Sequence, residues 1–495
     1  MHFVLYQPQR LVQIAKANNV GKYTPRERIL IGMLSAAGVP YKTAKDLYGV
    51  SESYYYKKRK DAEKILDVLA VQEDAPGGVI LITPQFISRC VTALLVICNV
   101  SVERIVEFFD EVFHYHVSKG TIGNIQKKSS KKAFGIDLRI TLELIKYIAL
   151  DEIFQQGQPV LTGVDLETQY VFMMEIAPDR TGDTWESALL TKKANGLNPK
   201  LCVSDAGSGL QSGVPAAVQE ITMQLDVFHA LRDIGIHVMR RERTGIALMS
   251  ELFALESRVN SPKTHKKTIE RYETLSRTID DTLLRTDTLC ILYDWLKELT
   301  GFSGYGYEKS ISLCTWILDE MIPLFPEDKK FQKALSSFRS RLPNILKFLC
   351  RLRDNLQEAA VFNNYDPHDL MLLYHQRTYS AYSAEYAAIE KRLFQKMGNR
   401  ILDARELLSD IIHMTYRASS MIENVNGRVR CYMNMKREIP EDFLILLKLY
   451  FNTRKAVRPA NRHWVHTSAL DRLTGCDNPS FLDMLFGSPD YLICA

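Results

Sequence analysis

The stretch Tyr147-Ile148-Ala149-Leu150-Asp151-Glu152-Ile153-Phe154 decides the fold of this chain. It is a short apolar run with β-branched residues, which is typical of a strand. Two similar runs follow at 159–164 and 169–176 after Gln/Gly and Asp-Leu-Glu-Thr turns, so we predict a three-stranded meander. The pattern continues with a helix over 185–192, a strand over 200–204, a helix over 208–219 and a strand over 221–227. The sequence therefore predicts one α/β domain in this region.

The residues beyond this region predict helices. From 231 to 416 apolar residues recur every three or four positions and no strand signal remains. Two more helices are predicted over 419–432 and 441–450. Three antiparallel strands followed by alternating helix and strand is the element order of a ribonuclease-H-like fold. We therefore expect a multidomain, mainly α chain with one α/β domain, whose core (140–230 and 417–495) is interrupted by an all-helical insertion (231–416).

The first 72 residues predict a helix-turn-helix unit. Helices are expected over 26–36 (with Thr24 as N-cap), 42–48 and 52–69, with the turn Gly49-Val50-Ser51 before the last. That last helix opens with aromatic and basic groups, which suit base edges and phosphates. The alternative is a solvated basic helix whose tyrosines lie in the core. The candidate DNA contacts are Tyr54, Tyr55, Lys57, Lys58, Arg59 and Lys60.

A second helical unit is predicted over 80–135, after a linker at 72–80 that contains Pro and Gly. Ser101 can cap a helix over 102–111, and the residues 117–125 open another helix that ends in lysines. This arrangement is consistent with a second helix-turn-helix-like DNA-binding domain. Its candidate DNA contacts are Ser118, Lys119, Thr121, Lys127 and Lys128.

Composition narrows the class of protein. The 495 residues are 46% hydrophobic and 24% charged, a balance that excludes disorder over most of the length. No stretch approaches the roughly 18–20 apolar residues of a membrane span. The nine cysteines are scattered, which indicates reduced thiols. The net charge is only +5, yet residues 1–132 hold 19 Lys and Arg against 12 Asp and Glu, and residues 428–462 hold nine against three. Two basic segments suggest a polyanion partner.

Three carboxylates are the candidate catalytic residues and metal ligands. Asp151 lies in the first strand, Asp205 ends the strand 200–204, and Glu423 belongs to the helix 419–432. The first and fourth strands are adjacent in this fold, so the two aspartates would converge. Clustered oxygen ligands bind Mg²⁺ or Mn²⁺, and two such ions can activate an attacking oxygen and stabilise a leaving one. Glu152 competes with Asp151, because strand alternation lets only one of them point at the site.

Each carboxylate also has a purely structural interpretation. Asp151 could be a strand-end surface residue, and Asp205 could cap the helix that follows it. Glu423 could be a solvated residue on a helix.

Taken together, these residues resemble the DDE transposases of bacterial insertion sequences. The motifs are Ala149-Leu150-Asp151-Glu152, Val203-Ser204-Asp205-Ala206-Gly207 and Ser420-Met421-Ile422-Glu423-Asn424-Val425-Asn426. The aspartates are 54 positions apart and Glu423 follows 218 positions after Asp205. In that family a helical domain is inserted between the second Asp and the Glu, as expected here.

The resemblance implies an enzyme that binds terminal inverted repeats, cleaves DNA with two Mg²⁺ (or Mn²⁺) ions, and joins the 3′-OH to target DNA. It also implies self-association into a dimer or higher synaptic complex, and a cytoplasmic, nucleoid-associated bacterial protein. Asp226-Val227-Phe228-His229 is similar to an Asp-x-x-His motif of some of these enzymes, so His229 could contact the scissile phosphate; a core or capping role is the alternative.

The same resemblance places further side chains near DNA. Trp185 could stack on an unpaired base. The residues expected at the DNA backbone are Asn424, Asn426, Arg428 and Arg430, and those of the basic tail are Arg454 and Lys455. Two other functions stay open: a domesticated, non-catalytic DNA-binding protein, and a structure-specific nuclease of the same fold.

Overall fold

The computed structural model of the chain describes residues 23, 25–70, 82–260, 265–436, 438–459 and 461–487. The expected linker at 72–80 and the expected N-cap Thr24 lie outside these residues. The chain divides into two compact units, one made of Met1–Ile140 and Arg430–Ala495, the other of Thr141–Val429. Each unit is described in turn.

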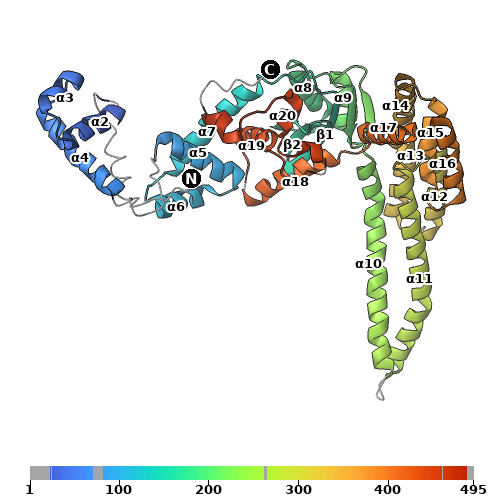
Figure 1. Cartoon of the computed structure of the whole chain (residues 1–495). Helices are drawn as coiled ribbons and strands as arrows, with labels where there is room; N and C mark the ends of the chain where they lie inside the picture. Colours follow the sequence, from blue (N-terminus) through green and yellow to red (C-terminus); the bar gives the residue numbers. More distant parts are fainter. Residues whose placement is uncertain are drawn as a thin grey trace. The chain divides into compact units, whose positions relative to one another are not determined.

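The first unit begins with three helices, α2 (Pro25–Ala36), α3 (Tyr41–Tyr48) and α4 (Glu52–Ala70), close to the predicted bounds (Figure 1). Gly49 ends α3 in the left-handed conformation, with φ of 61° and ψ of 32°, which glycine adopts without strain. The Ser51 hydroxyl accepts a hydrogen bond from the Tyr54 N–H at 3.4 Å and so caps α4. A small core of Ile31, Ala44, Val50 and Tyr55 joins the three helices.

The rest of the first unit is also helical. It comprises α5 (Pro84–Thr92) with a π-helical turn η1 (Ala93–Ile97), α6 (Val102–Phe113), α7 (Lys119–Asp137), α19 (Glu441–Thr453), η4 (Arg462–Trp464), α20 (Ala469–Thr474) and α21 (Phe481–Phe486). Ion pairs join its N- and C-terminal parts: Lys448 to Asp137 at 2.6 Å and Arg89 to Asp483 at 2.8 Å. We expected 417–495 to belong with the α/β core, whereas α19, α20 and α21 belong to this unit. The expected basic tail is therefore folded from Arg454 to Gly487, apart from the undescribed residue 460.

The second unit contains a five-stranded sheet in the order β3-β2-β1-β4-β5. Its strands are β1 (Tyr147–Gln155), β2 (Gln158–Asp165), β3 (Val171–Ile176), β4 (Leu201–Ser204) and β5 (Thr222–Leu225). The first three strands form the predicted antiparallel meander. Strand β4 pairs parallel with β1 in the register Leu150 to Ser204, and β5 pairs parallel with β4. The prediction that the first and fourth strands are adjacent is confirmed.

Helices α8 (Gly182–Lys193) and α9 (Ser208–Ala217) follow β3 and β4 and pack closely on each other. Their contact depends on glycine, because a Cβ on Gly213 would lie 2.3 Å from the Gly182 carbonyl oxygen and 2.8 Å from the Trp185 Cβ. Trp185 is fully buried at this contact. The suggestion that Trp185 stacks on a DNA base is therefore wrong: its ring is part of the core.

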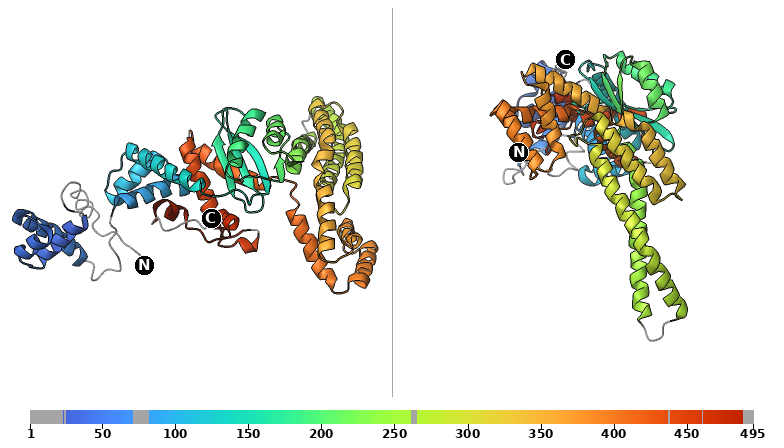
Figure 2. Two further views of the ribbon diagram at one scale, coloured as in Figure 1. Left: turned by 90° about the horizontal axis from the view of Figure 1, so that it is seen from above. Right: turned by 90° about the vertical axis from the view of Figure 1, so that its right-hand side faces the viewer.

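The remaining helices of the second unit form the large helical region predicted from the sequence. They are α10 (Val227–Val259), α11 (Lys266–Leu299), α12 (Tyr307–Met321), η2 (Ile322–Leu324), α13 (Lys329–Ile345), α14 (Phe348–Phe362), α15 (Pro367–His375), η3 (Gln376–Thr378), α16 (Ala384–Met397) and α17 (Arg400–Met414). Helices α10 and α11 lie side by side as a long hairpin (Figures 1 and 2). The chain then returns to the sheet through α18 (Ser420–Met435), on which Glu423 lies.

Candidate active site

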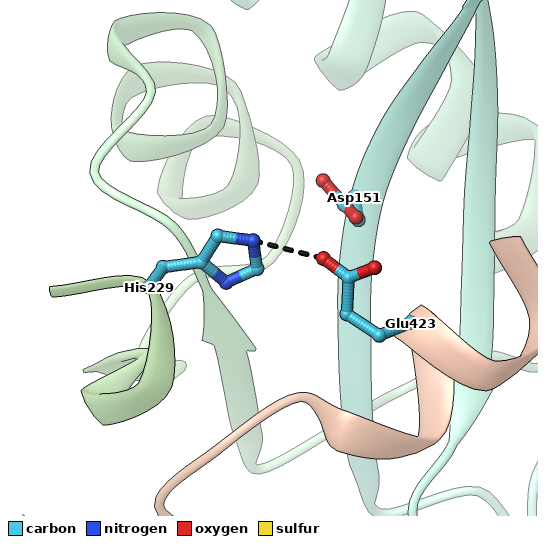
Figure 3. A group of neighbouring side chains, drawn as sticks. All are labelled: Asp151, His229 and Glu423. Carbon is cyan, nitrogen blue, oxygen red and sulfur yellow. Dashed lines mark ion pairs between the residues drawn. The ribbon is translucent and has the colours of Figure 1, made fainter. Parts of the chain in front are cut away.

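Three ionisable side chains from distant parts of the sequence converge beside the sheet: Asp151 of β1, His229 of α10 and Glu423 of α18 (Figure 3). One ligand atom from each lies within 4.8 Å of the others. The His229 Nε2 atom is 3.0 Å from Glu423 Oε1. Asp151 and Glu423 are 272 positions apart in the sequence, so their proximity depends entirely on the tertiary fold.

Asp151 is buried, and each of its two carboxylate oxygens accepts one hydrogen bond. Asp151 is only 9% exposed to solvent. Oδ2 accepts a hydrogen bond from Asn426 Nδ2 at 2.6 Å, and Oδ1 accepts one from the Glu152 N–H at 2.9 Å. Burial, reinforced by the charge of Glu423, raises the pKa of Asp151 to about 7, although nearby His229 opposes this.

His229 occupies the first turn of α10, where Asp226 is the N-cap residue. Asp226 Oδ1 accepts hydrogen bonds from the Phe228 and His229 N–H groups at 2.6 and 3.1 Å. The imidazole Nδ1 lies 3.1 Å from Asp226 Oδ2 without hydrogen-bond geometry, so this contact is an ion pair. The Asp226 carboxylate, helped by Asp151 and Glu423, raises the pKa of His229 to about 9 despite burial. The ring is thus an imidazolium at neutral pH.

Asp226 also anchors the return of the chain from the helical region. Its Oδ2 accepts hydrogen bonds from both the N–H and the hydroxyl of Ser419, which immediately precedes α18. Burial alone would raise the pKa of Asp226, but the contacts with His229 and Ser419 outweigh it and lower the pKa. One buried carboxylate therefore positions both the helix that carries His229 and the helix that carries Glu423. This fits the capping role considered for the Asp-x-x-His motif in the sequence.

Asp205 lies next to this cluster but is not one of its members. It follows Ser204, the β4 residue paired with Leu150, so its backbone stands beside Asp151 on the neighbouring strand, where strands are about 4.8 Å apart. Its Oδ1 accepts a hydrogen bond from the Gly207 N–H at 2.8 Å. The side chains of Asp151 and Glu423 thus lie close to each other, and the backbone of Asp205 lies beside that of Asp151.

Glu152, the competitor of Asp151, is engaged elsewhere. Its side chain is 7% exposed and its Oε1 accepts a hydrogen bond from Arg180 Nη1 at 3.1 Å. Burial, with a contribution from the charge of Asp205, raises the pKa of Glu152. Asp151, not Glu152, joins His229 and Glu423.

The donor set suits a hard divalent cation. Two carboxylates offer oxygen atoms within reach of one another, and Asp205 could add a third from the neighbouring strand. His229 also offers an imidazole nitrogen, which would have to lose its proton before binding a metal. The side chains that could hold a cation are thus those of Asp151, His229 and Glu423, with Asp205 on the neighbouring strand.

The residues of α18 that are expected at the DNA backbone do not all lie on the same face of the helix. Asn424, Arg428 and Arg430 are exposed. Asn426 is fully buried: besides its bond to Asp151, its Oδ1 accepts a hydrogen bond from Thr162 Oγ1 at 3.0 Å. The expectation that Asn426 faces DNA is therefore wrong, because it lies on the face of α18 that packs on the sheet.

The candidate DNA contacts of the first three helices also fall into two groups, those that are buried or paired within the protein and those that are exposed. Tyr55 is 1% exposed in the core, so its expected contact with DNA is wrong. The Tyr54 ring packs on Tyr23 at 5.2 Å between centroids. Lys58 is bonded to Asp61 at 2.5 Å and Arg59 to Glu63 at 2.7 Å. The side chains that remain exposed without a described ion pair are Lys57 and Lys60.

The second set of candidates lies on α7 and in the C-terminal segment. Ser118 caps α7 by accepting a hydrogen bond from the Thr121 N–H at 3.1 Å, and Lys119 pairs with Glu103 at 2.8 Å. Lys127, Lys128 and Arg454 are exposed. Lys455 is paired with Asp471, at 2.6 Å, and with Asp477, which makes it a structural cation of this unit.

Sequence reasoning missed two polar residues that build the site. Thr162, opposite Asp151 in the β1–β2 register, is buried and bridges Asn426 to the Asp151 carbonyl oxygen. Ser419 anchors α18 to Asp226. A buried threonine in an apolar strand gives no signal by itself, but Ser419, the first residue of the predicted helix 419–432, is of a type that favours a helix N-terminus.

Fold and site together define an enzyme-like cluster of carboxylates between a mixed sheet and a helical region. Residues 88–293 match the family model of the transposases of the Mutator family. This match, which includes Asp151, Asp205, Asp226 and His229, supports a transposase, and with it DNA as a substrate. No curated protein matches the chain. Among the described residues, no helix is both long and apolar enough to cross a membrane.

Proposed function

We propose that the chain is a DDE-type DNA transposase with a ribonuclease-H-like core. It binds transposon terminal inverted repeats, cleaves DNA in a Mg²⁺-dependent reaction, and transfers the freed 3′-OH into target DNA as a dimer or higher assembly. The observation that carries this proposal is the convergence of Asp151 and Glu423. The order β3-β2-β1-β4-β5, with three antiparallel strands and then two parallel ones, supports the assignment of the core.

Each side chain then has a defined task. Asp151, Asp205 and Glu423 would hold the divalent cations, and the chemistry that these ions would supply is activation of the attacking oxygen and stabilisation of the leaving 3′ oxygen. Asn426 fixes the orientation of Asp151 through its 2.6 Å bond. Asp226 keeps His229 protonated, so that Nε2 presents a positive hydrogen-bond donor to Glu423 or to a phosphate oxygen.

DNA binding is assigned to the exposed basic residues of the helical modules. Lys57 and Lys60 of α4, and Lys127 and Lys128 of α7, are the cations best placed for phosphates, because their side chains are exposed.

The first experiment is nicking of supercoiled DNA in Mn²⁺ by wild type, Asp205→Ala and Glu423→Ala. Glu256→Ala, which removes an exposed carboxylate of α10, is the control. We expect nicking by wild type and by the control, and its loss in both other variants. Nicking that survives both substitutions would refute the metal site.

A second assay separates transposase from nuclease. Pre-cleaved DNA with a free 3′-OH is incubated with a circular target, and joined products are sequenced. Nicking without any joined product would favour the nuclease. Binding without nicking would favour a non-catalytic DNA-binding protein.

A further inference from the structure

A cavity of about 610 Å³ opens in the second unit, at the end of the sheet where its parallel strands begin. Its lining includes Tyr147, Leu201 and Thr222, the first residues of β1, β4 and β5, which are neighbours in the strand register. Helices α14 and α17, which contact each other, supply most of the remaining lining (Figure 1). Asp151 lies four residues further along β1, about 13 Å away at about 3.3 Å per residue, so this cavity is separate from the candidate active site.

One side chain of the lining, Arg351 of α14, is a half-buried cation without a carboxylate partner. Its Nη1 donates a hydrogen bond to Gln224 Oε1 at 3.1 Å, and its Nη2 donates one to the Tyr416 carbonyl oxygen at 2.7 Å. Both acceptors are uncharged, and no Asp or Glu of the described residues forms an ion pair with this guanidinium. Burial lowers the pKa of Arg351 to about 10, so the group is still protonated at neutral pH. Because a charge that is withdrawn from water is normally paired, this guanidinium is suited to binding an anion.

A second cation lines the same cavity. Lys200, directly before β4, is exposed and forms no ion pair with a described residue. Two positive charges at one cavity favour a ligand group with more than one negative charge over a single carboxylate. A phosphate monoester is such a group, since it carries about −1.5 to −2 charges at pH 7.

The apolar part of the lining is suited to a ring. Phe362, on the last turn of α14, is 89% exposed, so little of the described chain covers it. Leu201 and Met414 add further apolar surface. Eleven positions of α14 separate Arg351 from Phe362, about 16 Å along the helix axis. A ligand that touches both side chains is therefore elongated, with its anionic group and its ring at opposite ends.

A carboxylate adds a preference for the ring. Glu358 lies seven positions after Arg351, hence on the same face of α14, and it lines the cavity. Its exposed carboxylate can accept a hydrogen bond from an amino group. The cavity volume falls in the roughly 300–1,000 Å³ range of small-molecule sites, which leaves room for an organic body beside the anionic group.

We propose that this cavity binds a mononucleotide, with its phosphate between Arg351 and Lys200 and its base against Phe362. A guanidinium can give two parallel hydrogen bonds to a phosphate, and an aromatic ring can stack on any base. Glu358 favours a base with an exocyclic amino group, such as adenine. Because strands and helices both line the cavity, a bound nucleotide stabilises the second unit through contacts with both. The proposal goes beyond the proposed function and does not depend on DNA cleavage.

Isothermal titration of the full chain in EDTA measures the binding, so that metal ions and DNA cleavage take no part. The probes are AMP, IMP, adenosine and inorganic phosphate, with phenylalanine as a ligand that has a carboxylate, an amino group and a ring but no phosphate. The variants remove one lining group each, and they are Arg351→Gln, Lys200→Gln, Phe362→Ala and Glu358→Gln.

Two matched controls change neighbouring or equivalent side chains outside the lining. Val361→Ala removes apolar surface beside Phe362, at a residue that is 74% exposed. Lys333→Gln removes the charge of an exposed lysine on α13. Thermal melting establishes that each variant is folded. Lys200 and Phe362 are exposed, so their variants test the site even where Arg351→Gln, which breaks two hydrogen bonds of the fold, does not fold.

We expect wild type to bind AMP about 10-fold or more tightly than adenosine or inorganic phosphate, because only AMP uses both the cations and the ring. Phe362→Ala should weaken AMP binding about 5-fold or more, the lower end of the effect of one stacked base, and Lys200→Gln about 2- to 5-fold. Arg351→Gln should remove most of the preference for AMP over adenosine. Glu358→Gln should reduce only the preference for AMP over IMP, whose base lacks the amino group. Both controls should keep the affinity of wild type.

Equal affinity of wild type for AMP and adenosine would overturn the proposal, because the two cations would then bind no phosphate. Failure of AMP to bind at millimolar concentration would overturn it too. Losses in the two controls as large as those in Phe362→Ala and Lys200→Gln would place the nucleotide elsewhere on the chain. Tighter binding of phenylalanine than of AMP would make the ligand an amino acid and reject the nucleotide. Nicking in Mn²⁺ is scored separately, so failure of the proposed function and failure of this site are distinguishable.

Discussion

Replacing Asp151 with asparagine tests the electrostatics of the candidate active site in one step. The substitution keeps the shape of the side chain and removes the charge that burial disfavours. In the folded chain the pKa of Asp151 is raised from 3.8 to about 7. For an acid with a raised pKa, the folded state binds the proton more tightly than the unfolded state, so stability falls as pH rises from about 4 to about 7.

The size of this effect follows from the shift. A shift of about three pH units at 1.36 kcal/mol each gives an upper bound of about 4 kcal/mol, lost in full above pH 7. The Asp151→Asn variant lacks this titration, so without metal it should be the more stable protein at pH 8 and should differ little from wild type at pH 4. At about 2–4 °C per kcal/mol, a gain of several degrees in melting temperature is expected for the second unit.

Melting curves of both proteins in EDTA at pH 4, 6 and 8 measure the prediction, and Asp280→Asn, at an exposed carboxylate of α11, is the control. Mg²⁺ or Mn²⁺ should then stabilise wild type at pH 8 and have a smaller effect on the variant, because a bound cation pairs with the ionised carboxylate. A variant that is less stable than wild type at pH 8 without metal would refute the reasoning, as would equal stabilisation of both proteins by the cation.

Three further substitutions have definite expected outcomes. Asn426→Ala removes the bonds to two buried groups and should destabilise the second unit by about 2–3 kcal/mol in urea unfolding, with loss of nicking. Gly209→Ala places a Cβ 2.0 Å from the Arg180 carbonyl oxygen, so the start of α9 must shift; nicking should fall, and unchanged nicking would show that this contact does not position the nearby metal ligand. Lys60→Gln should reduce the magnitude of the slope of log K against log salt for DNA binding by about one, whereas Lys58→Gln, which removes an amino group already bonded within α4, should change it less. An unchanged slope in Lys60→Gln would remove Lys60 from the interface.

The strands could be predicted from the sequence because apolar runs and turns are local signals. Strand β1 was expected over 147–154 and ends one residue later, and β4 begins one residue later than expected. The roles of individual side chains required the tertiary structure. Tyr55 and Lys57 lie two positions apart on α4, yet only the packing of α2 and α3 decides that the tyrosine enters the core and the lysine does not.

The candidate site shows the same division between local and tertiary signals. Asp151 could be predicted because its apolar strand has little structural reason to carry charge. Glu423 lies on a polar helix and was a candidate because of its motif and its position after the second aspartate. The burial of Asn426 could not be predicted from the sequence, because an asparagine beside a glycine on a helix is equally compatible with a solvated face. Only the neighbouring strand, with Thr162 at the right register, explains why its amide lies inside.

The charge balance of the cluster gives a physical reason for a divalent cation there. Three carboxylates, those of Asp151, Asp226 and Glu423, surround the single imidazolium of His229. These carboxylates outnumber the imidazolium beside them, and burial, with smaller contributions from the charges of Glu423 and Glu152, raises the pKa of Asp151 to about 7. A divalent cation would balance the site and release that proton, so cation affinity should rise with pH up to about 7 and level off above it. Isothermal titration with Mn²⁺ in two buffers of different ionisation enthalpy would count the proton, and a binding enthalpy independent of the buffer at pH 6 would contradict this account.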